Sequence, residues 1–418
     1  MLGADLPEAQ RNRLLRRVDW RFLLPVPRVE KAVCFPGGDL RDGVALIARQ
    51  VVAAGADHTT DCDLVVALNP DAAVLEGARA ALRPGGVCYT EWHNFTPGGA
   101  RAIMRRLRAA GFGDARGYLA WPSSSRPYVW IPLDSAGAIG YFQRHLHSPS
   151  RARKLAARIL RPAVTLGAQI GVIGPLCFVA RKPGAPGEEN AEPLLFATIR
   201  HGWTGWGLVD APSDLAVLLL TRGPRTANKI AGLVFAGRDL RPRLVVKIAR
   251  VADARPGLLC EATTLPGIQA ICGDGLKGVP KVLFTVDDQS GVAVGETALP
   301  GTPLLTLLSR RRYRSLALQA TDWLVDLAQC ARRDDRTPLG GRLVDEALAD
   351  FARSFGSLIE PELLARTRRA MAGLGDLPSV CEHRDFSPWN VFVTPDEGFA
   401  VFDWESSEPA GLPGLDLL

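Results

Sequence analysis

The chain has 418 residues and a formal net charge of +6; 47% of its residues are hydrophobic and 22% are charged. This length and composition allow two domains, each with its own core. The charge suits anionic small molecules as well as nucleic acid, but no aromatic and basic repeat argues specifically for nucleic-acid binding. Residues 1–30 are charged throughout and lack an apolar core, so we expect no N-terminal signal peptide.

The first part of the chain alternates between strand and helix patterns. Residues 63–68 form an apolar run typical of a buried strand, residues 72–82 have a helical pattern, and residues 87–91 predict another strand. The turn residues at 83–86 separate the last two elements. Such alternation predicts a parallel sheet, so we expect an α/β, Rossmann-like N-terminal domain.

Two short motifs in this part carry a family resemblance. Leu-Arg-Pro-Gly-Gly at 82–86 and Ala-Ala-Gly-Phe at 109–112 resemble the second half of class I S-adenosylmethionine-dependent methyltransferases. Those enzymes bind their cofactor mainly in the first half, on a glycine-rich loop. Residues 32–39 match that loop imperfectly, one strand-helix unit is shortened or absent, and no acidic ribose ligand is evident. The resemblance therefore favours a degenerate methyltransferase-like domain over an active one.

Residues 144–180 contain a basic stretch followed by an uncharged one. Residues 162–180 carry no charge, but glutamine, threonine, proline and glycine make them only weakly apolar. We therefore expect a buried helix and strand there rather than a membrane span. The basic residues at 144–161 are compatible with peripheral contact to a membrane or an anionic glycan.

A polar stretch rich in proline and glycine predicts a linker at residues 183–194. The linker would end the methyltransferase-like domain at residue 182. The remainder would divide into a sheet-rich lobe at 195–300 and a helical lobe at 301–418. This organisation predicts an α+β C-terminal part with an antiparallel sheet.

Three strands are predicted at the start of this part, at residues 215–220, 229–236 and 243–250. Lys247 lies inside the apolar run of the third strand, where an unpaired ammonium group is costly. Glu261 follows in a helix-like stretch. An alternative is that Lys247 points to solvent from an edge strand and Glu261 lies on an exposed helix face. Between the first two strands only Gly223 is available for a phosphate-binding turn, and no Gly-x-Gly-x-x-Gly is present.

The next elements are a hairpin and a helical region. Residues 279–286 and 292–296 predict two strands around a strong turn. Residues 297–301 would connect them to the region 304–371, in which apolar residues recur mainly at steps of three or four. We expect this region to form the helical lobe.

Four polar residues near the end of the chain have the order and chemistry of a phosphoryl-transfer centre. His383 and Asp385 are followed by Asn390 and then by Asp403. An aspartate can accept the proton of an attacking hydroxyl, and an asparagine with a second aspartate can hold Mg2+. The alternative is that Asp385 caps a turn while Asn390 and Asp403 are ordinary loop residues.

The local pattern around these residues favours the site. Residues 379–381 predict a strand before the loop, and residues 391–393 and 399–402 predict two strands joined by a turn at 394–398. The two strands of such a hairpin bring Asn390 and Asp403 to the same end. One metal ion could then contact both.

At these residues the chain resembles the aminoglycoside phosphotransferase family, small-molecule kinases with a protein-kinase-like fold. The resemblance lies in His-Arg-Asp-Phe-Ser-Pro-Trp-Asn at 383–390 and Asp-Trp-Glu at 403–405. Protein kinases usually carry lysine two residues after the catalytic aspartate, where this chain has Ser387, and Asp-Phe-Gly at the metal site. The resemblance therefore favours a small-molecule acceptor over a protein.

The resemblance implies ATP and Mg2+ as cofactors and the hydroxyl of a sugar or an amino-alcohol as acceptor. It also implies a role for each candidate residue. These roles are Asp385 as catalytic base, Asn390 and Asp403 as metal ligands, Lys247 paired with Glu261 on the nucleotide phosphates, Gly223 in the phosphate loop, and backbone groups from Glu296 to Ala298 at the adenine edge.

Members of that family usually continue through several more helices, whereas this sequence ends 15 residues after Asp403. We therefore expect a helical lobe that is incomplete at its C-terminus. Two other functions stay open: a two-domain pseudokinase and pseudomethyltransferase scaffold, and an S-adenosylmethionine-dependent methyltransferase. The sequence does not indicate the oligomeric state.

Eight cysteines occur without a Cys-x-x-Cys pair, and several lie within apolar strand patterns, as buried free thiols do. We therefore expect free thiols and a cytoplasmic protein.

Overall fold

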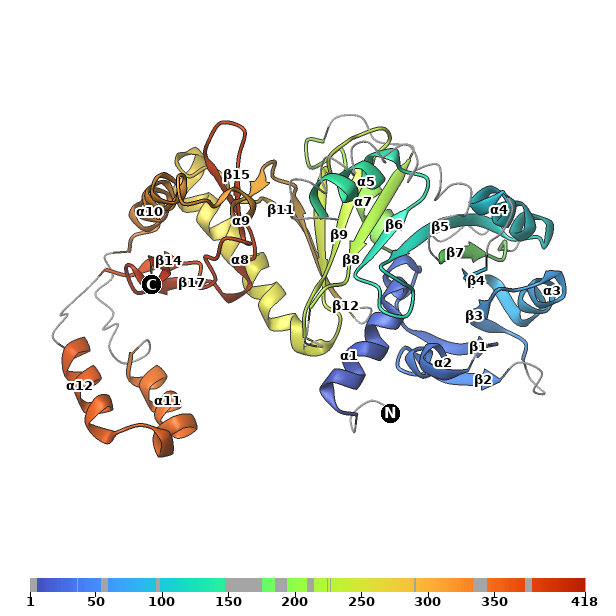
Figure 1. Cartoon of the computed structure of the whole chain (residues 1–418), viewed down its shortest axis with the longest axis horizontal. Helices are drawn as coiled ribbons and strands as arrows, with labels where there is room; N and C mark the ends of the chain where they lie inside the picture. The colour runs from blue at the N-terminus through green and yellow to red at the C-terminus, as the bar shows by residue number, and fades with distance from the viewer. Residues whose placement is uncertain are drawn as a thin grey trace. The chain divides into compact units, whose positions relative to one another are not determined.

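The computed structural model forms two compact units (Figure 1). The first comprises residues 1–255 and 283–296, and the second comprises residues 256–282 and 297–418. The structure describes residues 6–35, 37–53, 59–94, 98–146, 175–184, 194–208, 214–223, 225, 227–288, 291–333, 344–372 and 378–417.

Four parallel strands open the first unit. They are β1 (Val29–Cys34), β2 (Ala48–Ala53), β3 (Cys62–Leu68) and β4 (Leu82–Trp92), in the order β2-β1-β3-β4. Helix α2 (Gly38–Val44) connects β1 to β2, and α3 (Ala72–Ala81) connects β3 to β4. The predicted parallel α/β arrangement is therefore confirmed, and Figure 1 shows α2 and α3 beside these strands.

The same sheet continues as antiparallel strands. In sheet order after β4 these are β7 (Leu176–Arg181), β5 (Gly113–Trp121), β6 (Val129–Pro132), β8 (Leu215–Leu220), β9 (Ile230–Ala236), β10 (Leu244–Ile248), β12 (Gly291–Thr297) and β11 (Val282–Asp288). Within the described residues the sheet has 12 strands. Val129 of β6 pairs with Leu220 of β8, so the predicted strands of the sheet-rich lobe extend the N-terminal sheet.

The compact units divide after residues 255, 282 and 296, whereas the sequence predicted boundaries at a linker over 183–194 and at residue 300. The β6–β8 pairing places β8, β9 and β10 in the first unit. The domain boundaries from the sequence stay a prediction. Residues 185–193 of the predicted linker lie outside the described residues.

Side chains pack on both faces of this sheet. Along β3, Leu64 and Val66 join one buried cluster and Val65 joins another, as expected where successive side chains point to opposite faces. Four further α-helices of this unit are described. They are α1 (Glu8–Arg17), α4 (Gly99–Ala109), α5 (Ala136–Tyr141) and α7 (Leu194–Gly202), and the unit ends at the first residue of α8 (Arg255–Cys272).

Helix α1 is fixed to the parallel strands by a buried ion pair. Nη2 of Arg17 donates to Oε2 of Glu91 over 2.7 Å, and the hydroxyl of Tyr89 donates to Oε1 over 2.8 Å. Although burial raises the pKa of Glu91, the hydrogen bonds from His93 and Arg17 outweigh it and hold that pKa at about 2. Trp20, which follows α1, stacks on Tyr89 with 3.8 Å between ring centroids.

The second unit is built from helices and short strands. Its helices are α8, α9 (Leu304–Leu307), α10 (Tyr313–Cys330), α11 (Ala347–Phe355) and α12 (Pro361–Ala372). Its strands are β13 (Thr302–Pro303), β14 (Val380–Glu382), β15 (Val391–Val393), β16 (Phe399–Val401) and β17 (Glu408–Gly411). The helical pattern predicted over 304–371 is confirmed for its described residues, and the predicted strand pair is β15 and β16.

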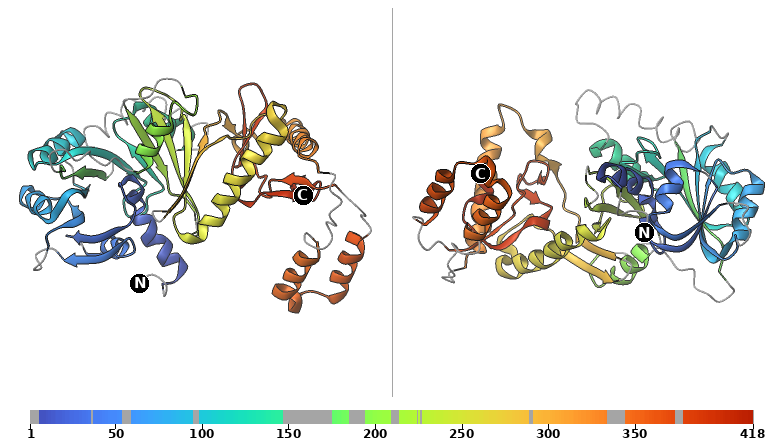
Figure 2. Two further views of the ribbon diagram at one scale, coloured as in Figure 1. Left: turned by 180° about the vertical axis from the view of Figure 1, so that it is seen from behind. Right: turned by 90° about the horizontal axis from the view of Figure 1, so that it is seen from below.

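The core of the second unit lies between these helices and the strands β15 and β16. Leu265 of α8, Leu327 of α10, Val401 of β16 and the following Trp404 are all buried in one cluster. Helices α11 and α12 lie side by side, as Figure 2 shows, and neither has a buried residue.

The expectation of free thiols is wrong for two of the cysteines. Cys272 at the end of α8 and Cys330 at the end of α10 form a disulfide, and their Cα atoms are 5.1 Å apart. The pair is separated by 58 residues, so no local spacing reveals it. The other six cysteines are free thiols.

Among the helices that the structure describes, none is long and apolar enough to cross a membrane. Residues 176–180 of the uncharged stretch belong to the buried strand β7. Most of the basic stretch at 144–161, and residues 162–174, lie outside the described residues. Membrane or glycan contact by the basic stretch stays a prediction.

A glycine in the second unit supports the strand that leads to Asp403. The carbonyl of Gly278 accepts a hydrogen bond from Val401 N over 2.8 Å, its φ is +83°, and an added Cβ would lie 1.7 Å from the carbonyl oxygen of Phe399. We expect Gly278→Ala to lower the free energy of unfolding by about 2–3 kcal/mol, because backbone must move to admit the methyl group. Urea denaturation would measure it.

The matched control is Gly267→Ala on α8, where an added Cβ meets nothing within 4 Å. It should raise the free energy of unfolding by roughly 0.5–1 kcal/mol, as expected for glycine replaced within a helix. Equal stability of the two variants would contradict the assigned role of Gly278.

Candidate functional site

The predicted site residues fall into two sets, one in each compact unit. Asp385, Asn390 and Asp403 belong to the second unit, together with Glu261 and Ala298. The other set, in the first unit, consists of Gly223, Lys247 and Glu296.

The β15–β16 hairpin brings two of the acidic and amide side chains to one end. Val391 of β15 pairs with Val401 of β16. The residues next to this pair, Asn390 and Phe402, are joined by a hydrogen bond from Phe402 N to the carbonyl of Asn390 over 2.9 Å. At the other end Thr394 N donates to the carbonyl of Gly398 over 2.9 Å, which closes the predicted turn. Asp403, directly after Phe402, has a left-handed φ of +72°.

Asn390 is also bonded to Asp385. Its Nδ2 donates to Oδ2 of Asp385 over 2.8 Å and to the carbonyl oxygen of Asp385 over 3.0 Å. An ionised carboxylate can only accept, so the amide nitrogen must face it and the amide oxygen Oδ1 faces elsewhere. Asp385 itself is exposed. The structure therefore brings together Asp385 and Asn390 by a direct contact, and Asn390 and Asp403 through the hairpin.

His383 supports this loop from the buried side. Its Nε2 lies 2.8 Å from the carbonyl oxygen of Phe402, and its Nδ1 accepts from Asp385 N over 3.2 Å. The two contacts require the tautomer with its proton on Nε2, because a carbonyl accepts and a backbone N–H donates. Burial lowers the pKa of His383, which keeps this neutral form.

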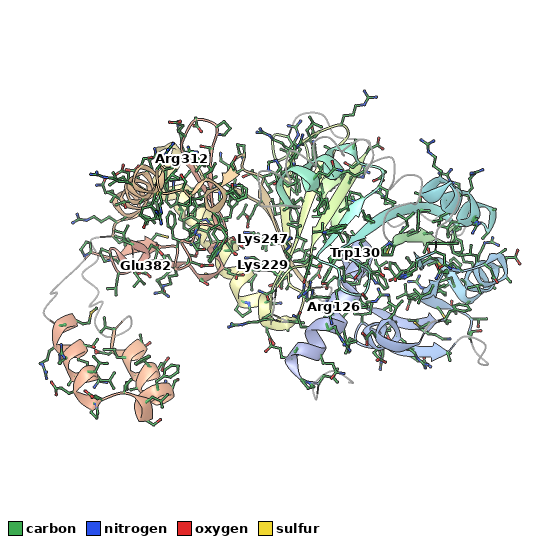
Figure 3. The ribbon with its side chains drawn as sticks, in the orientation of Figure 1. Arg126, Trp130, Lys229, Lys247, Arg312 and Glu382 are labelled. Atoms are coloured by element: carbon green, nitrogen blue, oxygen red, sulfur yellow. A yellow bond between two sulfur atoms is a disulfide. The ribbon has the colours of Figure 1, made fainter. Side chains whose placement is uncertain are left out.

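Two acidic residues that sequence reasoning did not identify also hold the loop. Asp416 accepts from His383 N and from Arg384 N, both over 2.6 Å, and Arg384 has a left-handed φ of +63°. Glu382, labelled in Figure 3, is buried and accepts from Nε of Arg384 over 2.6 Å. Glu382 adjoins the motif and could have been suspected from its place in an apolar strand, whereas no sequence signal identifies Asp416.

The donor set at the hairpin end fits a magnesium ion. Oδ1 of Asn390 and the carboxylate of Asp403 are hard oxygen donors, and Mg2+ is usually bound by one or two carboxylates with phosphates and water completing its shell. Within the described residues no group of three or more histidines, cysteines, aspartates or glutamates could hold a metal. A site with so few protein ligands would need a phosphate ligand to complete it.

In the first unit Lys247 is buried on β10 and paired. Its Nζ is 3.1 Å from Oε2 of Glu296, and both side chains are less than a tenth exposed. Glu296 comes from β12, the neighbour of β10 in the sheet. Figure 3 labels Lys247 and also Lys229, which precedes β9, the strand on the other side of β10. The sequence predicted a backbone role for Glu296 and missed its side chain.

Glu261 is fully buried on α8. Its Oε1 accepts from Trp404 N over 2.8 Å, so this glutamate connects α8 to the segment that carries Asp403. The predicted pairing of Glu261 with Lys247 would join the two compact units and stays a prediction.

The remaining predicted residues lie in turns. Gly223 has a φ of +133°, and an added Cβ would lie 2.3 Å from the side chain of Asn228, so only glycine fits there. Asn228 closes this turn by accepting from Arg225 N over 2.7 Å. Ala298 is half-buried and follows Thr297, whose N–H donates to the carbonyl of Lys281 over 2.9 Å.

A family comparison agrees with these features. Residues 233–416 match the model of the phosphotransferase enzyme family. No curated protein sequence matches the chain. The resemblance of the C-terminal part to the aminoglycoside phosphotransferases is therefore confirmed. The fold class is confirmed as well: an α/β N-terminal part and an α+β kinase-like part.

Solved structures of aminoglycoside phosphotransferases are also similar to part of the chain. A thermostable mutant of APH(4)-Ia, in a ternary complex with AMP-PNP and hygromycin B, is 17% identical over 47% of this chain and 69% of its own, with a TM-score of 0.33. The enzyme from Alicyclobacillus acidocaldarius is 14% identical over 44% and 61%, with a TM-score of 0.28. An aminoglycoside-3'-phosphotransferase of type VIII is 23% identical over 48% and 70%, with a TM-score of 0.28.

These similarities are low, so the classification depends on the sequence match at residues 233–416 and on the site itself. Residues 233–416 are thus similar to the phosphotransferase enzyme family. The methyltransferase resemblance of the N-terminal part is not among these matches and stays a prediction.

The buried neutral His383 generates a pH prediction. Its pKa in the folded protein lies below the ordinary value of 6.5, so below about pH 6.5 the unfolded chain binds more protons than the folded one. We therefore expect the free energy of unfolding to fall as the pH decreases from 7.5 to 5.5, with this residue contributing at most about 1.4 kcal/mol per pH unit.

The measurement is urea denaturation across this range for the wild type and for His383→Gln, which does not titrate. The variant should be less stable at pH 7.5 but should lose less stability on acidification. Identical pH slopes for the two proteins would show that His383 does not carry the effect.

Proposed function

We propose that the protein is an ATP-dependent phosphotransferase that transfers the γ-phosphoryl group to a hydroxyl of a small molecule of the sugar or amino-alcohol type. The observation that carries the proposal is the contact of Asn390 with Asp385, in a loop whose next strand returns as Asp403. A general base and two oxygen ligands for a metal thereby come from one short stretch of chain.

Asp385 would act as the base in this reaction. Its Oδ2 accepts from Asn390, which leaves Oδ1 of an exposed carboxylate for the hydroxyl of the acceptor. As the hydroxyl oxygen bonds to the γ-phosphorus, its proton passes to Asp385, and the bond from the γ-phosphorus to the bridging oxygen breaks to release ADP. His383 and Asn390 hold Asp385 in place from its backbone and from its side chain.

Oδ1 of Asn390 and the carboxylate of Asp403 would hold the magnesium ion. When bound, the ion neutralises charge on the phosphates. Lys247 would bind the α- and β-phosphates of the nucleotide, and Glu261 would pair with Lys247. The turn at Gly223 would approach the phosphates. The backbone from Glu296 to Ala298 would contact the adenine. The ion pair of buried Lys247 with Glu296 supports this role because it fixes the position of the Lys247 side chain.

The metal assignment is tested without knowledge of the acceptor. We expect ATP to raise the melting temperature of the wild type only when Mg2+ is present, since a ligand that binds the folded state stabilises it. Asp403→Asn should abolish most of this Mg2+-dependent rise because it removes the anionic ligand. Differential scanning fluorimetry with ATP, with and without Mg2+, measures it.

Asp396→Asn is the matched control, because Asp396 lies in the exposed turn of the same hairpin. It should respond to Mg2+ and ATP as the wild type does. A wild type whose melting temperature ATP and Mg2+ leave unchanged would instead favour the pseudoenzyme scaffold.

The base assignment is tested by turnover. A panel of sugars, amino-alcohols and aminoglycosides would be screened for acceptor-dependent ADP release. We expect Asp385→Asn to reduce kcat by about 100-fold or more while MgATP binding persists, because a general base contributes typically that much. Undiminished turnover in this variant, with Asp396→Asn again as control, would refute the role of Asp385.

A further inference from the structure

The turn that contains Gly223 is held by the N-terminal helix. Nδ2 of Asn12, on α1, donates to the carbonyl oxygen of Gly223 over 3.2 Å, and the two residues are 211 positions apart in the chain. Asn12 is only 6% exposed. All the groups in this contact belong to the first compact unit. A segment that precedes the predicted methyltransferase-like strands therefore reaches the candidate phosphate loop.

The other end of the Asn12 side chain contacts a buried arginine. Nη1 of Arg250, just after β10, donates to Oδ1 of Asn12 over 3.1 Å, and Nη2 donates to the carbonyl oxygen of Thr221 over 2.8 Å. The carbonyl group of Thr221 is thus bound by Arg250 and that of Gly223 by Asn12. The loop between β8 and β9 is fixed at two of its first three residues.

Arg250 is itself held by the segment after α1. Its Nη2 is 3.0 Å from Oδ2 of Asp19, and neither side chain is exposed. Nη2 of Arg21 donates to the carbonyl oxygen of Arg250 over 2.8 Å. The two buried guanidinium groups thus donate to backbone carbonyls as well, Arg250 to that of Thr221 and Arg21 to that of Arg250.

These bonds decide how the loop presents itself to a ligand. In a trans peptide the C=O and the following N–H point in opposite directions. Because the carbonyl of Thr221 points inward to Arg250, the N–H of Arg222 points away from this network. An outward backbone N–H next to a glycine is a group that binds phosphate in such turns, and here it is that of Arg222, because the residue after Gly223 is a proline and has no N–H.

We infer that Asn12 is a positioning residue for the nucleotide phosphates: it orients the Gly223 turn by bonding Gly223 and Arg250 at the same time. The inference rests on the proposed function, since it assigns the turn to phosphate binding. It also makes the N-terminal segment part of the nucleotide site.

The test uses the whole chain and two substitutions, Asn12→Asp and Asn12→Ala. Asn12→Asp keeps an acceptor for Arg250, but it replaces the donor to Gly223 by a repelling oxygen. Asn12→Ala removes both bonds. The matched control is Arg13→Ala, on the next residue of α1, whose side chain is exposed and pairs with Asp39.

The readouts are the Kd values for MgATP and for adenosine by calorimetry, with the melting temperature of each variant. We expect both Asn12 variants to weaken MgATP binding by about five- to tenfold, the size expected for one buried hydrogen bond. Adenosine binding should be unchanged, because adenosine lacks the phosphates. Arg13→Ala should bind both as the wild type does.

A merely structural role for Asn12 would lower the melting temperature and the active fraction without changing the Kd of the folded protein. MgATP affinity within twofold of the wild type in both variants would overturn the inference, and so would an equal loss of adenosine affinity. A wild type that binds no MgATP would overturn the proposed function itself, and the inference with it.

Discussion

Burying a charge without a partner costs on the order of several kcal/mol, and this constraint organises both compact units. Several buried charged side chains find a partner on another segment, so satisfying the charge also fixes the position of that segment. In the first unit the pairs are Lys247 with Glu296, Arg250 with Asp19 and Arg17 with Glu91. In the second unit Glu261 and Glu382 accept from the chain around the candidate catalytic loop.

In the first unit, a boundary suggested by sequence composition does not coincide with the edge of a packed core. A proline- and glycine-rich stretch marks a change in sequence character, but a core forms wherever strands can pair and bury their faces. Val129 of β6 pairs with Leu220 of β8 across that stretch, and α1 spans the junction with Arg17 on Glu91 and Asn12 on Gly223. Strands before and after that stretch therefore share one sheet.

The catalytic hairpin could be predicted because its information is local. Alternating apolar residues, a turn and two polar residues at the strand ends all lie within a short stretch, so Asn390 and Asp403 were assigned to one end correctly. The partner of Lys247 could not be predicted in this way, because Glu296 is its neighbour only through the order of β10 and β12. The disulfide and the contact of Asn12 with Gly223 likewise depend on tertiary packing between distant residues.

The candidate catalytic loop combines one exposed carboxylate with buried support. Asp385 must be accessible to an acceptor, so burial cannot fix its position. Its backbone N–H is instead bonded to buried His383, which in turn contacts the carbonyl of Phe402 in the segment before Asp403. The candidate base and the segment before the candidate metal ligand are therefore joined through one imidazole, whose lowered pKa favours the neutral form that both contacts require. Protonating that imidazole would remove the acceptor for the backbone N–H of Asp385 and so loosen the candidate base without any change at its carboxylate.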